Sequence, residues 1–247
     1  MATVDLNADL GEGFEFDVEL MGIVSSCNIA CGGHTGDETS MAATVRLAMQ
    51  NDVRIGAHPA YPDRPGFGRT SAFAGGEELK QSLIEQIVNL RDIASVAGGS
   101  VVHVKPHGAL YNDAADSREL ASVVVEAVRS AAPGVTLVGP PASALHQVAF
   151  DNQVRYLAEA FVDRAYLPDG RLVPRSEVNA VHSDINTITT QALMLATSNR
   201  VTAEDGAVIE VHADTLCIHG DTANASQVAR AVRDVLELHG VTIRAAH

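Results

Sequence analysis

The sequence contains little that would recognise a nucleic acid or a membrane. Tryptophan is absent and only 4% of the 247 residues are aromatic, so few rings are available to stack on bases. Basic residues are also scarce, with 17 Lys and Arg against 31 Asp and Glu and a formal net charge of −14. Because such a surface repels phosphate backbones and anionic lipids, we expect neither a nucleic-acid nor a membrane partner.

Cysteines and long apolar runs are equally scarce. The chain has three cysteines, an odd number, and its N-terminal residues show no secretory pattern. No apolar run has the length that a bilayer-spanning helix requires. We therefore expect a cytoplasmic protein with reduced thiols. Cys27 and Cys31 are four residues apart, but no second pair completes a zinc site, so we interpret them as packed core residues.

Short apolar runs alternate with helical patterns along the chain, and hydrophobic residues make up 46% of it. Runs typical of buried strands occupy residues 4–8, 25–31, 53–57, 101–104, 135–138, 154–158 and 215–218. Helical spacing lies near residues 37–49, 77–97, 117–131, 142–150, 186–198 and 225–239, and residues 207–211 are a further candidate edge strand. This alternation indicates a parallel α/β sheet that is covered on both faces.

Seven such strands predict a closed (β/α)7 barrel, formed as a single domain by residues 1–247. The length is normal for one barrel of this kind. A flat, doubly wound sheet is the alternative. We favour the barrel because polar residues follow six of the seven strands, whereas a flat sheet would gather them at one crevice.

The fourth predicted strand leads into the most unusual stretch of the sequence. Its apolar run ends at Pro106, because proline cannot donate to a strand ladder. The two-residue period of a strand places His103 and Lys105 on one face, and His107 follows directly. A cation and two imidazoles are costly to bury alone, so we expect them to face polar groups from other strand ends.

Polar side chains also follow the other predicted strands. In a barrel, active-site residues lie at the carboxyl ends of the strands. The residues that we expect there are Asp9, Glu12, His34, His58, Lys105, His107, Glu159, Asp163, Arg164, His219 and Asp221. Each alone has a structural explanation, such as a helix cap, a satisfied histidine or a surface ion pair. Four of the ten histidines directly follow predicted strands, however, and this joint pattern favours a functional site.

No sequence motif identifies the chemistry of this site. The chain lacks a Gly-x-Ser-x-Gly elbow, a Walker phosphate loop and a His-Glu-x-x-His helix. One interpretation is a divalent metal held by Asp9, His34 and His58. The other is acid–base catalysis in which Lys105 and Arg164 stabilise an oxyanion or a phosphate. The residues alone leave both interpretations open.

Seven segments spread over about residues 4–243 resemble the LamB/YcsF family. They are Asn7-x-Asp9-Leu10-Gly11-Glu12, Asn28-Ile29-Ala30-Cys31-Gly32, His58-Pro59-x-Tyr61-Pro62-Asp63, Gly66-Phe67-Gly68-Arg69, His103-Val104-Lys105-Pro106-His107-Gly108-Ala109-Leu110-Tyr111-Asn112, Asp163-Arg164-x-Tyr166 and Asp214-Thr215-x-Cys217-x-His219-Gly220-Asp221-Thr222. Two positions depart from the family pattern. Gly33 stands where a bulky aromatic residue is usual, and Ala60 stands where glycine is usual.

The resemblance implies a fold similar to the barrels of sugar deacetylases and glycoside hydrolases. It also implies ATP-dependent hydrolysis of 5-oxo-L-proline to L-glutamate, with Mg-ATP as cosubstrate and separate subunits B and C as partners. The implied catalytic residues are Asp9, Glu12, Lys105 and His107. The residues expected to bind the substrate or a phosphate are Asn7, Arg69, His103, Glu159, Asp163, Arg164, His219 and Asp221. Because the chain has no Walker loop, ATP must bind with another geometry or partly on a partner.

Two other functions fit the same residues. One is a metal-dependent deacetylase or amidohydrolase that acts alone, binds its ion at Asp9, His34 and His58, and needs no ATP. The other is a non-catalytic subunit that only binds a ligand or a partner. In that case Lys105→Ala or His107→Ala would leave an assembled complex fully active.

Overall fold

Seven parallel strands close into a barrel in the computed structural model, which describes residues 2–71, 76–220 and 224–246. The strands are β1 (Thr3–Leu10), β2 (Ser26–Ala30), β3 (Arg54–His58), β4 (Val101–Val104), β5 (Thr136–Gly139), β6 (Tyr156–Phe161) and β9 (Thr215–Ile218). They neighbour one another in that order, and β9 pairs with β1 to close the circle. The predicted (β/α)7 barrel is therefore confirmed.

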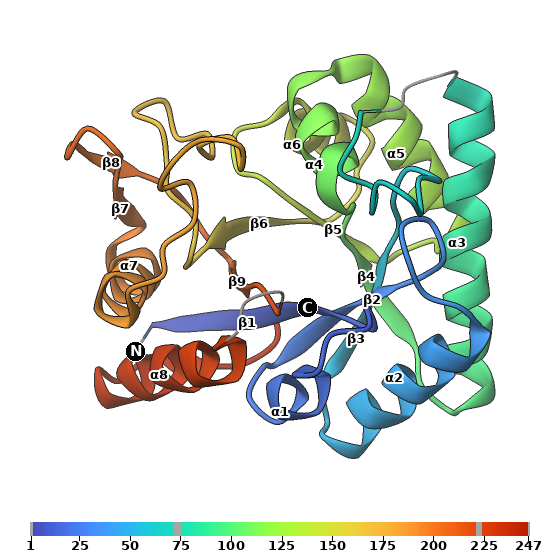
Figure 1. Cartoon of the computed structure of the whole chain (residues 1–247). Coiled ribbons are helices and arrows are strands. Elements are labelled where there is room, and N and C mark those ends of the chain that lie inside the picture. The colour runs from blue at the N-terminus through green and yellow to red at the C-terminus, as the bar shows by residue number, and fades with distance from the viewer. Residues whose placement is uncertain (1, 72–75, 221–223, 247) are drawn as a thin grey trace.

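Helices surround these strands on the outside (Figure 1). They are α1 (Asp17–Met21), α2 (Glu38–Gln50), α3 (Gly76–Val96), α4 (Gly108–Asp116), α5 (Arg118–Ala131), α6 (Ala144–Asp151), α7 (Ile185–Ser198) and α8 (Ala225–Leu238). The sequence patterns predict all of these except α1 and α4, which are short. None of the helices in the described residues is long and apolar enough to cross a membrane.

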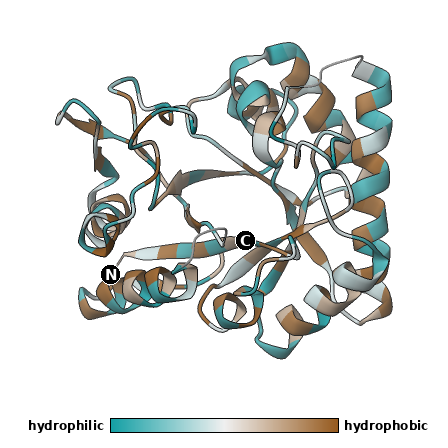
Figure 2. Cartoon of the chain, viewed as in Figure 1, coloured by the Kyte–Doolittle hydropathy of each residue, from teal (hydrophilic) through white to brown (hydrophobic). Residues whose placement is uncertain are grey.

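Each long helix buries one apolar face against the barrel, as α5 illustrates. Ser117 caps its first turn by accepting a hydrogen bond from the backbone N–H of Leu120 at 3.2 Å. Leu120, Val124 and Val128 follow at helical spacing and are buried. Figure 2 shows the corresponding mixture of hydrophobic and hydrophilic residues along the helices.

Two short strands outside the barrel correct the prediction for residues 207–211. Strand β8 (Val208–Glu210) pairs antiparallel with β7 (Arg200–Thr202) and forms a hairpin beside α7, not an edge of the barrel (Figure 1). Gly206 adopts a φ of 86° in the connecting turn, so the chain reverses there instead of continuing. Strand β10 (Thr242–Ile243) pairs with the start of β1.

The inside of the barrel is polar, because the alternation of β1 turns its polar face inward. At the amino end, the carboxylate of Asp5 accepts hydrogen bonds from Ser25, Ser26 and Thr215 at 2.6–2.7 Å. One layer higher, the amide of Asn7 donates to Thr215 at 2.7 Å and accepts from Asn28 at 2.8 Å. These hydrogen bonds join side chains of neighbouring strands and make the two layers mutually dependent.

His103 occupies the middle of this interior and is 1% exposed. Its Nε2 donates to Oδ1 of Asn28 at 2.9 Å. The neighbouring strand makes room for the ring at Gly56, where an added Cβ would lie 2.0 Å from the same nitrogen. Its proposed role in binding substrate or phosphate stays a prediction, and in the barrel His103 supports the polar layer below the site.

Candidate active site

The polar groups that follow four of the strands meet at the carboxyl end of the barrel. Lys105, after β4, places its Nζ 3.0 Å from Oδ1 of Asp9 on β1. Oδ2 of the same carboxylate is 3.3 Å from Nε2 of His58, at the end of β3. Asp9, Cys217 and His219 also offer donor atoms within 4.8 Å of one another. The strand ends therefore converge on one place, as expected for a barrel.

Three imidazoles and a carboxylate form the histidine cluster, defined here as Glu12, His34, His58 and His107. Their donor atoms all lie within 4.8 Å of one another. Oε1 of Glu12 is 2.9 Å from Nε2 of His34 and 3.4 Å from Nδ1 of His107. The rings of His34 and His107 stack with centroids 3.7 Å apart. Four ligands at about 2.0–2.2 Å in a tetrahedron would lie about 3.4 Å apart, which is the range of these separations.

The hydrogen bonds of the cluster favour a cation between its rings. Nδ1 of His58 contacts the carbonyl oxygen of Lys105 at 2.8 Å, and Nε2 of His107 contacts that of Phe67 at 3.0 Å. Since a carbonyl only accepts, both of these nitrogens carry the proton. The two remaining nitrogens, Nε2 of His58 and Nδ1 of His107, face each other at 3.0 Å. With both rings neutral their lone pairs would oppose each other, so a proton or a metal ion belongs between them.

The protonation states also suit a metal site. Burial lowers the pKa of His34 to about 3, and burial together with the charge of His58 lowers the pKa of His107 to about 3. Both rings are therefore neutral at pH 7, which is the form that binds a metal. Burial opposes a charge on His58, but the Asp9 carboxylate outweighs it and raises the pKa of that ring. Nδ1 of His34 is buried without a hydrogen-bond partner among the described residues.

A second group of buried side chains, the ion-pair network, consists of Asp9, Lys105, Glu159 and Cys217. The ammonium of Lys105 lies 2.9 Å from Oε1 of Glu159 and 3.1 Å from the sulfur of Cys217. Burial disfavours its charge, but Asp9, Cys217 and Glu159 outweigh that cost and raise the pKa of Lys105 well above its usual range. Burial likewise opposes the ionised form of Asp9, yet His58 and Lys105 hold its pKa well below normal. The network thus contains its own cation.

Asp163 and His219 form a separate pair beside this network. Nδ1 of His219 contacts both carboxylate oxygens of Asp163 at 2.9 Å, and its ring stacks on Phe161 with centroids 5.2 Å apart. Burial would raise the pKa of Asp163, but the neighbouring His219 outweighs it and lowers that pKa. The second nitrogen of the ring is left to face the site, and the His219 side chain is 13% exposed. An imidazole oriented by a carboxylate is the usual arrangement of an acid–base group.

Several other predicted site residues have a structural contact in this fold. Nε and Nη2 of Arg164 donate to the carbonyl oxygens of Ala180 and Val173 at 3.2 and 2.6 Å, so this arginine ties down the loop after β6. Arg69 is exposed and lies over the ring of Phe67, 5.1 Å from its centroid. Phosphate binding by either arginine stays a prediction. Asp221 lies outside the described residues.

Sequence reasoning missed the contributions of two residues to this site. Cys217 touches Lys105, but the sequence offers only a lone cysteine in a strand, which is normally a packing residue. Gln86 of α3 bonds both the N–H and the carbonyl of Ala60 at 2.9 Å. An added Cβ at Gly33 would lie 2.4 Å from Oε1 of Gln86, so the glutamine fills the space that a side chain at position 33 would need.

Comparison with known proteins identifies the family. The LamB/YcsF family matches residues 4–247. The A subunit of 5-oxoprolinase from Mycolicibacterium paratuberculosis is 45% identical over 250 residues, which cover 99% of each chain. The lactam utilization protein from Thermus thermophilus is 41% identical, superposes with a TM-score of 0.93, and is matched over 99% of this chain and 100% of its own. The chain belongs to the LamB/YcsF family.

A distant likeness places this LamB/YcsF barrel among known folds. A family 4 carbohydrate esterase from Streptomyces lividans superposes with a TM-score of 0.50 at 11% identity, over 98% of this chain and 91% of its own. At that identity the match concerns the fold alone. The T48 deacetylase superposes with a TM-score of 0.53 at 12% identity, over 98% of this chain and 87% of its own, which confirms the expected similarity of fold to a deacetylase barrel.

Proposed function

We propose that this LamB/YcsF protein is the hydrolytic subunit of an ATP-dependent 5-oxoprolinase. It opens the ring of 5-oxo-L-proline to give L-glutamate, together with subunits B and C. The names of its relatives support the substrate and the assembly. The observation that carries a hydrolytic role is the convergence of the histidine cluster, the ion-pair network and the Asp163–His219 pair at one end of the barrel.

The histidine cluster is proposed to hold a divalent metal. Three imidazoles and one carboxylate suit zinc and several other first-row transition ions. The opposed nitrogens of His58 and His107 support this assignment. A divalent metal held by these four residues would supply Lewis-acid chemistry to a carbonyl oxygen or a water molecule. Asp9, expected from sequence as a ligand, lies beside the cluster, while Glu12 and His107 complete it.

The protein's own groups then move the protons. Asp9 is ionised at neutral pH and takes a proton from the attacking water as the oxygen adds to the lactam carbonyl. His219, oriented by Asp163, gives a proton to the ring nitrogen as the carbon–nitrogen bond breaks. Lys105 keeps the Asp9 carboxylate in place and supplies positive charge next to the oxygen of the reacting carbon.

A small apolar face beside these groups fits the ring carbons of the substrate. Tyr111, Phe161 and Cys217 form a cluster of buried side chains, with Leu172 packed against it. Lys105 lies 5.4 Å from the centroid of the Phe161 ring, so this apolar face adjoins the ion-pair network. A five-membered lactam has only a few CH₂ groups, and a face of this size is enough to orient it.

The charge of the site argues for ATP acting on a partner subunit. Its largely buried groups include four carboxyls (Asp9, Glu12, Glu159 and Asp163) against two fixed cations, Lys105 and Arg164. An excess of carboxylates attracts a divalent metal but repels a triphosphate. We therefore place Mg-ATP on subunits B and C, where transfer of the γ-phosphoryl group to the lactam oxygen would release ADP and activate the ring. Addition of water at the activated carbon and cleavage of the carbon–nitrogen bond would then leave an acyl phosphate of glutamate, from which a second water would release inorganic phosphate and L-glutamate.

The decisive experiment measures glutamate release from 5-oxo-L-proline by the chain alone and mixed with subunits B and C, with and without ATP. The proposal expects turnover only in the complete mixture with ATP. It also expects turnover to be lost in His58→Ala but kept in His239→Ala, a change at the exposed C-cap residue of α8. Full activity of the complex containing His58→Ala would mean that this chain only binds a ligand or partner. Turnover by the isolated, metal-loaded chain without ATP would instead establish the stand-alone amidohydrolase, which the self-contained histidine cluster also supports.

A further inference from the structure

The loop that carries Asp163 is held from outside the barrel by one glutamine. Gln191 lies on α7 and is 6% exposed. Its Nε2 lies within hydrogen-bond distance of three carbonyl oxygens, those of Phe161 at 2.9 Å, Val162 at 3.2 Å and Arg164 at 2.8 Å. These carbonyls flank Asp163 on both sides. A single amide therefore fixes the path of the backbone through the residue that orients His219.

Other contacts of this segment come from β9, where the carbonyl oxygen of Cys217 accepts from the N–H of Val162 at 3.2 Å, and from the loop that follows the segment. The backbone N–H of His182 donates to the carbonyl oxygen of Asp163 at 2.8 Å. The backbone N–H of Phe161 donates to the hydroxyl of Tyr166 at 2.7 Å. These partners lie on β9 or in the following loop, whereas Gln191 joins the segment to α7.

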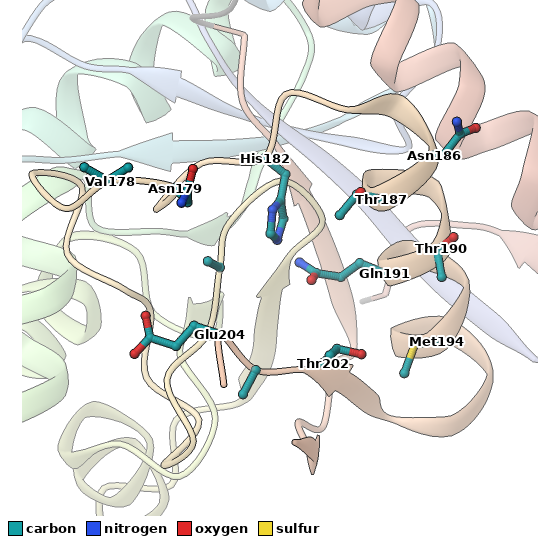
Figure 3. A pocket seen from close by; sticks show the side chains of 12 residues that line it. Val178, Asn179, His182, Asn186, Thr187, Thr190, Gln191, Met194, Thr202 and Glu204 are labelled. Atoms are coloured by element: carbon teal, nitrogen blue, oxygen red, sulfur yellow. The ribbon is translucent and has the colours of Figure 1, made fainter. Parts of the chain in front are cut away.

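A cavity of about 640 Å³ surrounds the same glutamine on the outside of the barrel. In Figure 3 Gln191 projects from α7 between His182 and Thr202. Thr190, the preceding residue, lines the same cavity but is exposed. The helix thus offers two adjacent polar side chains, of which Gln191 is bonded to the Asp163 segment and Thr190 serves as a matched control.

We infer that Gln191 is a positioning residue for the Asp163–His219 pair. By holding the three carbonyls, it sets the direction of the Asp163 carboxylate and thereby the hydrogen bond to Nδ1 of His219. Without its amide, three buried carbonyls lose a donor and the segment must shift to find new partners. A displacement of about 1 Å is enough to weaken a catalytic group by roughly 100-fold. For its effect on turnover, the inference rests on the proposed role of His219.

The test records the ring N–H proton of His219 by NMR in the full chain labelled with ¹⁵N-histidine. The signal is assigned by its loss in His219→Asn and by its change in Asp163→Asn. In Gln191→Met, which has a similar volume but no donor, we expect this proton to disappear or exchange rapidly. Gln191→Asn, whose amide is one methylene shorter, should show a weakened signal, and Thr190→Val should keep the wild-type signal. Circular dichroism and Tm report whether each variant is folded.

Turnover by the complex of this chain with subunits B and C distinguishes the positioning role of Gln191 from the proposed catalytic role of His219. We expect kcat to fall about 10–100-fold in Gln191→Met with little change in KM, because outer groups act through the residue that they hold. An unchanged His219 N–H signal in folded Gln191→Met or Gln191→Asn, or no such signal in the wild type, overturns the inference. Loss of the signal with unchanged turnover supports the positioning role and overturns the use of His219 in the proposed reaction.

Discussion

The histidine cluster and the ion-pair network lie side by side and share a boundary at Asp9, yet they solve the burial of charge differently. In the network, the Lys105 ammonium pairs with the carboxylates of Asp9 and Glu159 and contacts the Cys217 sulfur. In the cluster, His34 and His107 are neutral rings, and two ring nitrogens oppose each other at 3.0 Å. The network holds its own cation, whereas the opposed nitrogens of the cluster take a proton or, as we propose, a metal ion between them.

This difference predicts that changes in the histidine cluster chiefly alter metal binding, whereas changes in the ion-pair network chiefly alter the free energy of unfolding. Replacing His34 or His107, which are neutral rings, removes a candidate ligand without leaving a buried charge unpaired. Replacing Lys105 leaves two buried carboxylates without their cation. The following predictions rank the expected effects from the largest to the smallest.

Removing a cluster ligand should abolish activity. For His34→Ala we expect the turnover of the complete assembly to fall at least about 1,000-fold, because a metal ion contributes several kcal/mol to charge stabilisation. The free energy of unfolding of the metal-free protein should change much less. Steady-state kinetics and denaturation with and without zinc measure the two effects. Wild-type turnover in His34→Ala would show that the histidine cluster takes no part in the reaction.

Removing the network cation should chiefly destabilise the fold. Lys105→Met leaves Asp9 and Glu159 buried and uncompensated, at a cost of about 3–5 kcal/mol in the free energy of unfolding. The space vacated by the ammonium lies between Asp9 and Cys217, which with His219 form a second set of candidate ligands. We therefore expect cobalt(II) to add a thiolate absorption band in this variant and not in the wild type. Lys80→Met on α3 provides the control at the chain's other lysine.

Disconnecting His219 should slow the reaction without removing the metal. For Asp163→Asn we expect kcat to fall about 100-fold, within the range usual for general acid–base catalysis, and metal content to remain unchanged. Parallel turnover and elemental analysis check both parts. Loss of metal from Asp163→Asn would show that the Asp163–His219 pair and the histidine cluster do not act separately.

The Asp163 carboxylate should make the free energy of unfolding decrease as the pH falls. The pKa of Asp163 is lowered in the folded state, so the ionised group stabilises the fold above its ordinary pKa of about 4 and this contribution is lost as the pH falls through the lowered value. Urea unfolding should therefore show a gap of about 2 kcal/mol between the wild type and Asp163→Asn at pH 7 that narrows towards pH 3. If this difference in the free energy of unfolding stayed constant with pH, it would arise from packing and not from the charge of Asp163.

The smallest effect is expected when the native protein is treated with a thiol reagent. Burial raises the pKa of Cys31 to about 12 and raises that of Cys27 further, so neither thiol ionises at neutral pH. Iodoacetamide should leave both unmodified in the native protein and label them after unfolding, as mass spectrometry can record.

The fold could be predicted because its signals are local. Alternating strands and helices indicate a barrel, and Pro106 marks the place where β4 ends and the site begins. The period of β1 correctly places Asp5, Asn7 and Asp9 on one face, which the structure shows to be the barrel interior. These features depend on neighbours in sequence and on the geometry of a strand.

The composition of each group in the site could not be predicted, because it depends on loop paths. Glu12 reaches the histidine cluster through a turn in which Gly11 has a φ of 73°. His107 reaches it because Gly108, with a φ of 56°, lets the start of α4 approach the carbonyl of Gly68. Gln191 is 28 positions after Asp163 and belongs to no motif, so only the packing of α7 reveals its contacts.

Metal binding to the intact chain tests the central claim most directly. Metal-free wild type titrated with zinc by calorimetry should bind one ion per chain with release of protons, and His58→Ala and His107→Ala should each bind at least about 10-fold more weakly. His239→Ala should match the wild type. Wild-type chain that takes up no zinc, cobalt, manganese or iron, or variants that bind as tightly as the wild type, would contradict the account.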